Sequence, residues 1–242
     1  MLTDFHTHIL PGVDDGSDSI LQSLEMLRIL KKQNMSRVVA TPHFYPSSDH
    51  PKRFLVRRAM ALEQLEAALE PDMPRIIPAA EVRYFDGLSD CEQLEELTIG
   101  STPYLLVEMP GTPWTERMYR ELQEIWQKRS ITPVIAHVDR YISPFHTHHI
   151  PERLKELPVL VQANANFFLR RTSRSMAMKM LRDGQIHCLG SDCHNTSTRP
   201  PNLDKAVVVI AKALGADGLC PLVEWENRIF QHDPNADGWR IK

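Results

Sequence analysis

The sequence lacks several features that would place it in a specialised class of protein. It has no excess of basic charge, because 28 Lys and Arg residues stand against 31 Asp and Glu, which gives a net charge of −3. This balance gives no support to nucleic-acid binding, which usually requires a basic stripe on the surface. The sequence also has no run of about 18 apolar residues. We therefore expect no transmembrane helix and no direct membrane insertion.

Cysteines are few, and their spacing matches neither a zinc ribbon nor a C-x-x-C redox motif. The four of them are Cys91, Cys188, Cys193 and Cys220. A charge and a histidine occur within the first six residues, so a secretory signal is not expected. These features favour free thiols in a reducing cytoplasm.

No internal repeat or low-complexity linker divides the chain, which predicts a single domain spanning residues 1–242. Short apolar runs alternate with longer amphipathic segments. The runs predict strands at 2–6, 37–40, 75–79, 104–107, 133–136, 159–162 and 186–189. The amphipathic segments predict helices at 21–32, 54–69, 116–129, 175–182 and 203–214. This alternation, repeated so many times, favours a parallel α/β barrel over an open sheet.

Histidines and carboxylates stand where the predicted strands end. Six of the apolar runs terminate in a residue that could bind a metal ion. The ends of parallel strands in a barrel converge on one face, so these distant residues are expected to meet. In chain order they are His6 with His8, then His43, Glu81, Glu108, His137, and Asp192 with His194.

The spacing within this set is suited to metal binding. His6 and His8 are two residues apart, as are Asp192 and His194, and alternate strand residues point to the same side. Asp14 and Asp15, in the loop after the first strand, offer a further carboxylate. Imidazole and carboxylate without thiolate suit Mn, Fe or Zn better than Mg or Cu. Nine candidate ligands are too many for one ion, which favours two or three divalent ions.

Each candidate also has an ordinary structural explanation. A single histidine or aspartate at a strand end is more often a capping or loop residue than a ligand, and Asp15 beside Gly16 fits a turn. Six strand ends that share these residue types are harder to explain as turns. A second cluster, His146, His148 and His149, ends no strand, and we expect it to lie in a surface loop.

Several motifs, taken together, resemble those of a known family. They are H-T-H-I-L-P-G-V-D-D-G, A-T-P-H, A-A-E-V-R-Y, V-E-M-P, I-A-H-V-D-R-Y and S-D-C-H-N followed by R-P-P, and they extend from residue 1 to about 215. They resemble the polymerase and histidinol phosphatase (PHP) superfamily. The resemblance is closer to its bacterial branch of metal-dependent protein-tyrosine phosphatases, which act beside the tyrosine kinases of capsule and exopolysaccharide synthesis.

The resemblance implies a distorted (β/α)7 barrel that holds three metal ions, often manganese. It implies a phosphotyrosine protein as substrate, in this case an autophosphorylated bacterial tyrosine kinase. It assigns phosphate binding to Arg140 and Arg199. It assigns metal binding to His6, His8, Asp15, His43, Glu81, Glu108, His137, Asp192 and His194.

Two motifs depart from the family pattern. The usual A-H-P-E-R-Y is A-H-V-D-R-Y at residues 136–141, and the usual G-R-P-P is T-R-P-P at residues 198–201. The ligand and arginine positions survive both changes, so the departures concern loop shape and substrate choice. The residues from Ala216 onward match weakly and are given no role.

The expected mechanism is in-line attack of a metal-bound hydroxide on a phosphomonoester, with Arg140 and Arg199 clamping the non-bridging oxygens. Without the resemblance, the alternative for these arginines is that they form surface salt bridges, which we consider the less favoured interpretation. One alternative is a PHP-type phosphatase for a small metabolite such as histidinol phosphate. Another is a non-catalytic metal-binding protein, which the complete ligand set and both arginines argue against.

A cysteine-dependent phosphatase is a further alternative, because Cys193 and Arg199 fit the spacing C-x5-R. The five residues between them include no glycine to ease a tight phosphate-binding loop. The neighbouring Asp192 would raise the pKa of the thiol and not lower it. We therefore interpret this match as a coincidence.

Overall fold

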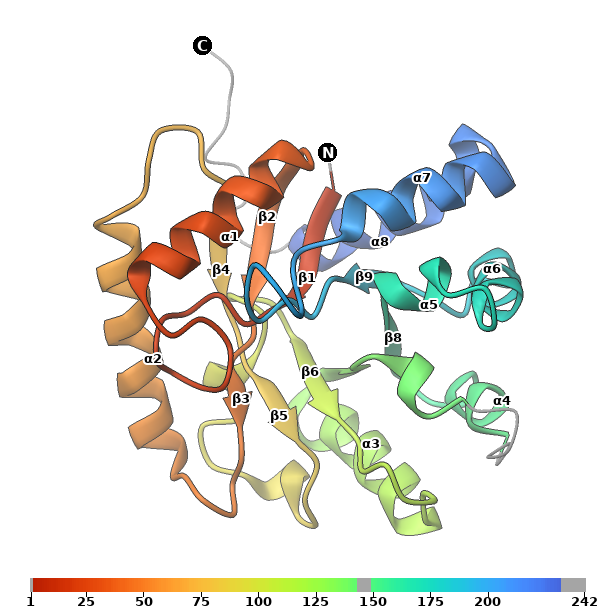
Figure 1. The fold of residues 1–242 in the computed structure, drawn as a ribbon. Helices are drawn as coiled ribbons and strands as arrows, with labels where there is room; N and C mark the ends of the chain where they lie inside the picture. The colour runs from red at the N-terminus through yellow and green to blue at the C-terminus, as the bar shows by residue number, and fades with distance from the viewer. Residues whose placement is uncertain (1, 143–148, 232–242) are drawn as a thin grey trace.

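Parallel strands curl into a barrel with the helices arranged around it (Figure 1). The structure, a computed structural model, describes residues 2–142 and 149–231. The strands are β1 (Leu2–Thr7), β2 (Met35–Ala40), β3 (His43–Phe44), β4 (Arg75–Pro78), β5 (Glu81–Arg83), β6 (Tyr104–Glu108), β7 (Thr132–Ile135), β8 (Leu160–Asn164) and β9 (Cys188–Gly190). The helices are α1 (Ile20–Lys32), α2 (Pro51–Glu66), α3 (Glu116–Arg129), α4 (Ile150–Leu154), α5 (Ala165–Leu169), α6 (Arg174–Arg182), α7 (Leu203–Leu214) and α8 (Cys220–Phe230). Short 3-10 turns lie at Leu88–Asp90, Glu95–Leu97, Val138–Arg140 and Ala216–Leu219.

The strands of the described residues occupy seven positions around the barrel, which we call staves. Two staves each contain two strands, β2 with β3 and β4 with β5, because the strand is interrupted near a proline. Pro42 lies between β2 and β3, and Pro78 is the last residue of β4 before β5 begins. Proline has no backbone N–H to donate, so it interrupts a strand ladder. One sheet pairs β1, β2 and β4, and the other pairs β3, β5, β6, β7, β8 and β9, all in parallel. A parallel bridge between Thr7 and Cys193 brings β9 beside β1, which confirms the distorted (β/α)7 barrel.

The inside of the barrel is filled by one apolar cluster, and a second cluster lies between the staves and the helices. The inner cluster takes at least one buried side chain from each stave, as a packed barrel requires. These side chains include Phe5, Val39, Ile77, Leu106, Val134, Leu160 and Cys188, joined by Ile229 and Phe230 of α8.

The C-terminal helix α8 lies against the N-terminal end of β1, although the sequence suggested no role for this segment. Its buried Glu226 accepts hydrogen bonds from the backbone N–H of Thr3 at 3.1 Å and from the Thr3 hydroxyl at 2.7 Å. Arg37 also donates to Glu226 at 2.9 Å. The ring of Phe230 stacks on Phe5 with centroids 5.6 Å apart. The segment therefore closes the end of the barrel that is opposite the strand ends.

Most of the predicted elements are present, with shifted ends. Helices α3 and α7 are confirmed over their full length. The helix predicted at 54–69 instead spans Pro51–Glu66, because His50 caps it and Pro51 fits the first helical position. Strands β3 and β5 and helices α4, α5 and α8 were not predicted. No helix in residues 2–142 or 149–231 is both long and apolar enough to cross a membrane.

Candidate metal centre

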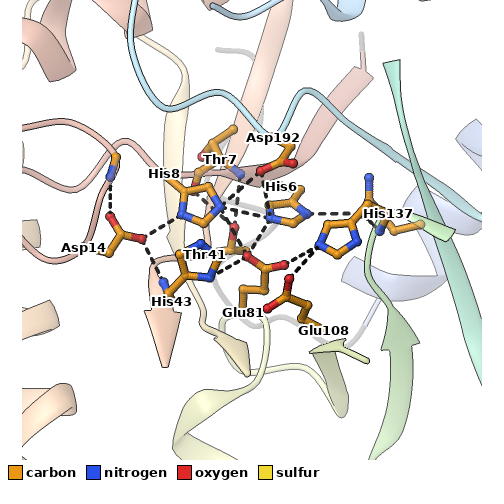
Figure 2. A network of polar contacts seen from close by, with 12 residues as sticks. His6, Thr7, His8, Asp14, Thr41, His43, Glu81, Glu108, His137 and Asp192 are labelled. Atoms are coloured by element: carbon orange, nitrogen blue, oxygen red, sulfur yellow. Dashed lines mark hydrogen bonds and ion pairs between the residues drawn. The ribbon is translucent and has the colours of Figure 1, made fainter. Parts of the chain in front are cut away.

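The predicted ligands gather at the carboxyl ends of the staves, and Figure 2 labels all of them except Asp15 and His194. His6 is the second-last residue of β1 and His8 follows the strand directly, while Glu108 is the last residue of β6. His137 follows β7, and the segment from Asp192 to His194 follows β9. These placements agree with the expectation from the sequence, because parallel strands bring their ends to one face.

His43 and Glu81 reach the same face by a different route. The sequence predicted that each would end a strand, but they are the first residues of β3 and β5. After the interruptions near Pro42 and Pro78, a new short strand begins at His43 and another at Glu81. These two residues pair with each other in the parallel ladder of β3 and β5. The two short strands therefore extend the barrel into the site.

Glu81 is at the centre of the cluster. Its Oε2 atom lies 3.1 Å from Nε2 of His6, 3.4 Å from Nε2 of His8 and 3.0 Å from Nδ1 of His43. Its Oε1 atom lies 2.7 Å from Nε2 of His137. The side chain is 1% exposed, and within the described residues Oε2 has no partner with hydrogen-bond geometry. Buried polar atoms are nearly always satisfied, so an unsatisfied oxygen facing three imidazoles fits a shared cation.

Asp15 is exposed, yet it points into the cluster. Its Oδ1 atom lies 3.5 Å from Nε2 of His43 and 3.6 Å from Nε2 of His194. The Nε2 atom of His194 is also buried without a hydrogen-bond partner among the described residues. Three groups of side chains present ligand atoms within 4.8 Å of one another: His8, Asp15, His43 and His194; His6, His8 and Glu81; and His43, Glu81 and Glu108.

His137 and Asp192 lie beside these groups and complete the predicted set. Asp192 Oδ1 lies 3.6 Å from Nε2 of His6 and 3.4 Å from Nε2 of His8. Both residues have positive φ angles, 31° at His137 and 55° at Asp192. Such backbone is costly for residues other than glycine and is concentrated at functional sites. All nine predicted ligands are thus brought together at one face.

Arg140 and Arg199 approach Asp192 from two sides. Arg140 Nη2 lies 2.6 Å from Asp192 Oδ2, and Arg199 Nη2 lies 2.8 Å from Asp192 Oδ1. Arg140 is also 3.4 Å from Glu108. The two arginine side chains are 42% and 39% exposed, so each keeps donors facing solvent at the mouth of the site. They are bound to carboxylates of the cluster and do not form the isolated surface salt bridges considered from the sequence.

The carboxylates dominate the electrostatics of the cluster. Burial lowers the pKa of His6, but the nearby charges of Glu81 and Asp192 outweigh it and raise that pKa above its usual value. Burial raises the pKa of Glu81, but His6 and the other imidazoles hold it well below its usual value. At His194, burial and the charges of His8 and Arg199 lower the pKa, which favours the neutral imidazole that a metal needs. The buried carboxylates thus favour positive charge at His6, whereas His194 is favoured as a neutral imidazole.

Asp14 contacts the ring of a ligand without being one, and residue type and position did not distinguish it from Asp15, which only the family resemblance named as a ligand. Its Oδ2 atom lies 2.7 Å from Nδ1 of His8 and accepts the backbone N–H of His43 at 2.8 Å. Metal-binding histidines commonly donate their second ring N–H to a carboxylate, which fixes the ring orientation. The two adjacent aspartates thus have different positions. Asp14 lies at Nδ1 of His8, and Asp15 lies near Nε2 of His43 and of His194.

Gln162 and Asn164 on β8 also hold ligands and were missed from the sequence. Gln162 Oε1 accepts the backbone N–H of His137 at 2.7 Å and lies 3.2 Å from Nδ1 of His6. Asn164 Nδ2 donates to Asp192 Oδ2 at 3.0 Å. A signal was present, because two polar residues alternate in an otherwise apolar strand whose residues are all buried.

Among the residues that the structure describes, the remaining candidates from the sequence form no second site. Cys193 is buried, and burial together with Asp4 raises the pKa of its thiol well above the usual value. A nucleophilic cysteine needs the opposite, so the C-x5-R match with Arg199 has no structural support. His149 is exposed just before α4, as expected for a surface loop, while His146 and His148 lie outside the described residues.

The family follows from a comparison of the whole chain with known families. Residues 2–229 match the family model described as "Capsular polysaccharide synthesis, CpsB/CapC". The chain belongs to the CpsB/CapC family. A relative from this family, the tyrosine-protein phosphatase YwqE of Bacillus subtilis, is 28% identical over 226 residues, which is 89% of this chain and 86% of YwqE. The tyrosine-protein phosphatase CpsB of Streptococcus pneumoniae is 27% identical over 225 residues, 89% of this chain and 92% of CpsB.

The fold of this CpsB/CapC member is also found in solved structures. It matches a structure from a study of YwqE from Bacillus subtilis and CpsB from Streptococcus pneumoniae, described as "unique metal-dependent tyrosine phosphatases". The TM-score is 0.81 at 23% sequence identity, and 93% of each chain is covered. A lactonase from Listeria monocytogenes shares the fold alone, with a TM-score of 0.57, 13% identity and 95% of this chain covered. The PHP-type barrel expected from the motifs is therefore confirmed.

Proposed function

We propose that this chain is a metal-dependent protein-tyrosine phosphatase that acts on a phosphotyrosine protein of capsule or exopolysaccharide synthesis. The substrate we favour is an autophosphorylated bacterial tyrosine kinase. One observation carries the proposal: nine imidazole and carboxylate groups converge at one face, with Arg140 and Arg199 beside them. The names of the relatives support the same activity.

The donor set suits two or three divalent ions, with Mn preferred and Fe or Zn as alternatives. The residues that would hold them are His6, His8, Asp15, His43, Glu81, Glu108, His137, Asp192 and His194. The unsatisfied Glu81 Oε2 and His194 Nε2 atoms support this fit. These residues would hold divalent ions, which would supply Lewis acidity and an activated water there.

The two arginines bind the phosphate of the substrate. Arg140 and Arg199 are held by Asp192 and keep N–H donors toward solvent, where two non-bridging phosphate oxygens can accept them. Their charge offsets the carboxylates that would otherwise repel an anion. The leaving phenol has a pKa of about 10, so it needs less protonation than an alkoxide would. An acid supplied by the protein is therefore less important for phosphotyrosine than for an alkyl ester.

The exposure of the site supports a protein substrate over a small metabolite. Asp15 is 67% exposed and Arg140 is 42% exposed, so the otherwise buried cluster reaches solvent at the edge where these two side chains lie. A small metabolite would be better held by a deep, closed pocket that surrounds it.

The four cysteines form no disulfide, which is consistent with our proposal of a reducing, cytoplasmic location.

A comparison of substrates tests this function. With Mn supplied, the wild-type protein should hydrolyse a phosphotyrosine peptide far faster than histidinol phosphate or a phosphoserine peptide. Arg140→Lys and Arg199→Lys should each lower kcat/KM by about 100-fold or more, as expected when a donor to the transition state is lost. Arg117→Gln, a matched change on the exposed surface, should have no effect. Faster hydrolysis of histidinol phosphate would replace the protein substrate by a metabolite.

A further inference from the structure

A pocket of about 470 Å³ lies beside the candidate metal centre and extends away from it. Asp15 and His43 form its inner wall, so it opens from the cluster itself. Its lining also includes Tyr45, Asp49, Arg53 and Arg57, which form its outer part. None of these outer residues belongs to the metal ligands or to the phosphate-binding arginines. Their chemistry therefore bears on the part of the substrate beyond the phosphate.

The backbone at the end of β3 aims Tyr45 into this pocket. Phe44 is fully buried and packs on Phe54, with ring centroids 5.1 Å apart. Alternate residues of an extended chain point to opposite sides, so His43 and Tyr45 share the other side. Their rings stack with centroids 5.0 Å apart and an angle of 27° between the planes. His43, which is labelled in Figure 2, is a candidate metal ligand. The Tyr45 ring therefore lies directly against a ligand of the cluster.

One side of the Tyr45 ring is available to a ligand. The residue is 40% exposed, which is high for a large aromatic side chain next to a buried cluster. Aromatic rings pair favourably in stacked or edge-to-face arrangements with centroids 4.5–7 Å apart. The distance from phosphorus to the ring in an aryl phosphate is fixed by one bridging oxygen. An aryl phosphate bound at the metal centre would thus place its ring within reach of Tyr45.

The outer end of the pocket carries excess positive charge. Asp49 is mostly buried, and its carboxylate lies 2.7 Å from Arg57 Nη2 and 3.6 Å from Arg53 Nε. Two guanidinium groups therefore share one carboxylate, which leaves one positive charge unbalanced. Arg53 is 77% exposed and makes the longer contact, so it is the group free to bind another anion. An acidic side chain on the substrate is complementary to this end.

We propose that this pocket binds the leaving-group side of the substrate, with the tyrosyl ring against Tyr45 and an acidic side chain near the phosphotyrosine paired with Arg53. The proposal rests on the tyrosine phosphatase function and adds to it a preference for aryl phosphates in an acidic peptide segment. Tyr45 is a specificity-determining residue, and Arg53 selects among peptides. Neither takes part in the attack on phosphorus.

The aromatic contact is tested by binding, without turnover. Phenylphosphonate and methylphosphonate carry the same anionic group and differ in the ring, so each is titrated into the Mn-loaded protein. Tyr45→Leu should weaken phenylphosphonate about 3- to 10-fold and leave methylphosphonate unchanged. Tyr45→Phe keeps the ring and should bind both as the wild type does. Val56→Ala, on the exposed surface of α2, is the matched control.

The charged contact is tested with two phosphotyrosine peptides that differ in one flanking position, Glu or Gln. The wild type should favour the Glu peptide by about 2- to 5-fold in kcat/KM, and the preference should shrink at high salt. Arg53→Gln should abolish the preference and leave kcat/KM for the Gln peptide unchanged. Lys52→Gln removes the same charge from the neighbouring exposed residue, outside the pocket, and should keep the preference.

Two results would overturn the proposal: an equal effect of Tyr45→Leu on both phosphonates, or a preference for the Glu peptide that survives Arg53→Gln. A failure of the phosphatase function is distinguishable from these outcomes. In that case the wild type would not hydrolyse either peptide, while a Tyr45-dependent preference for phenylphosphonate would still support the aryl-binding role of the pocket.

Discussion

The carboxylate of Asp14 holds the imidazole of His8 from behind, with Oδ2 2.7 Å from Nδ1. This contact fixes the orientation of the ring and turns Nε2 toward Glu81 and Asp192. Burial raises the pKa of Asp14, but the hydrogen bond and charge of His8 lower it to about 2. Asp14 is therefore ionised at neutral pH and orients a ligand without being one.

Replacement of Asp14 should weaken metal binding while the ligands stay in place. We expect Asp14→Ala to lower the affinity for Mn by about 10- to 100-fold, as is typical when the partner of a metal-binding histidine is removed. The measurement is a titration of metal-free protein with Mn. Asp18→Ala, an exposed aspartate of the same loop region, is the control. Unchanged affinity in Asp14→Ala would show that His8 does not depend on this contact.

Gly190, the last residue of β9, should be essential for the packing of His6. A Cβ atom there would lie 2.5 Å from Cβ of His6 and 2.8 Å from Nε2 of Gln162. We expect Gly190→Ala to lower the free energy of unfolding by about 1–3 kcal/mol and to reduce Mn binding, because the clash displaces His6. Denaturant unfolding and Mn titration measure the two effects. Gly111→Ala, where a Cβ meets no atom within 4 Å, should be neutral, and an equally neutral Gly190→Ala would contradict the packing described here.

The hydrogen bonds of Glu226 should stabilise the barrel without affecting its chemistry. Glu226→Ala leaves the Thr3 N–H and hydroxyl without their acceptor, so we expect the free energy of unfolding to fall by about 1–3 kcal/mol. The folded variant should keep the kcat/KM of the wild type, because α8 lies at the other end of the barrel. Urea unfolding checks the first expectation and steady-state kinetics the second. Glu224→Ala, an exposed neighbour on the same helix, is the control, and equal stability of both variants would refute the role of Glu226.

His187 should make the stability of the fold depend on pH. Burial lowers its pKa to about 4, and its Nδ1 atom accepts the backbone N–H of Val161 at 3.0 Å, which requires the unprotonated ring nitrogen. The unfolded chain binds a proton at its usual pKa of about 6.5, so below that pH protonation favours unfolding. Above pH 6.5, His187 should cause no pH dependence in the free energy of unfolding. Between pH 6.5 and 4, protonation of the unfolded chain should lower that free energy by up to about 3 kcal/mol.

Denaturant unfolding at several pH values measures this dependence. His187→Asn should lose most of the decrease between pH 6.5 and 4, because it has no group that titrates there. His50→Asn, an exposed histidine, should retain the decrease seen in the wild type. The same slope in His187→Asn and the wild type would assign the effect to other groups.

The sequence predicts the barrel and the convergence of the ligands because both follow from local patterns. The run from Glu116 to Arg129 has a helical period and a Thr115 cap, so its ends are correctly predicted. Strands β3 and β5 have two and three residues, too few for a period to be recognised. The role of α8 depends on contacts such as Phe5 with Phe230, which are distant in the chain and leave no local signal.

The limits of prediction at the site are of the same kind. Asp14 and Asp15 are adjacent and chemically identical, so only the turn of the backbone decides which one lies behind His8 and which one points to His194. The pairing of Arg140 and Arg199 with one carboxylate likewise depends on how two loops approach each other. Residue types and spacing indicate the class of site, and the tertiary arrangement determines the part of each residue in it.

The most direct test of the account is to remove metal from the protein, titrate it with Mn, and measure bound ions and phosphotyrosine hydrolysis in the same samples. We predict that activity disappears on chelation and returns as two or three Mn ions bind per chain. Both should be lost in Glu81→Gln, because Glu81 contacts four imidazoles of the cluster. Full activity of the metal-free protein, or wild-type Mn binding by Glu81→Gln, would contradict the account.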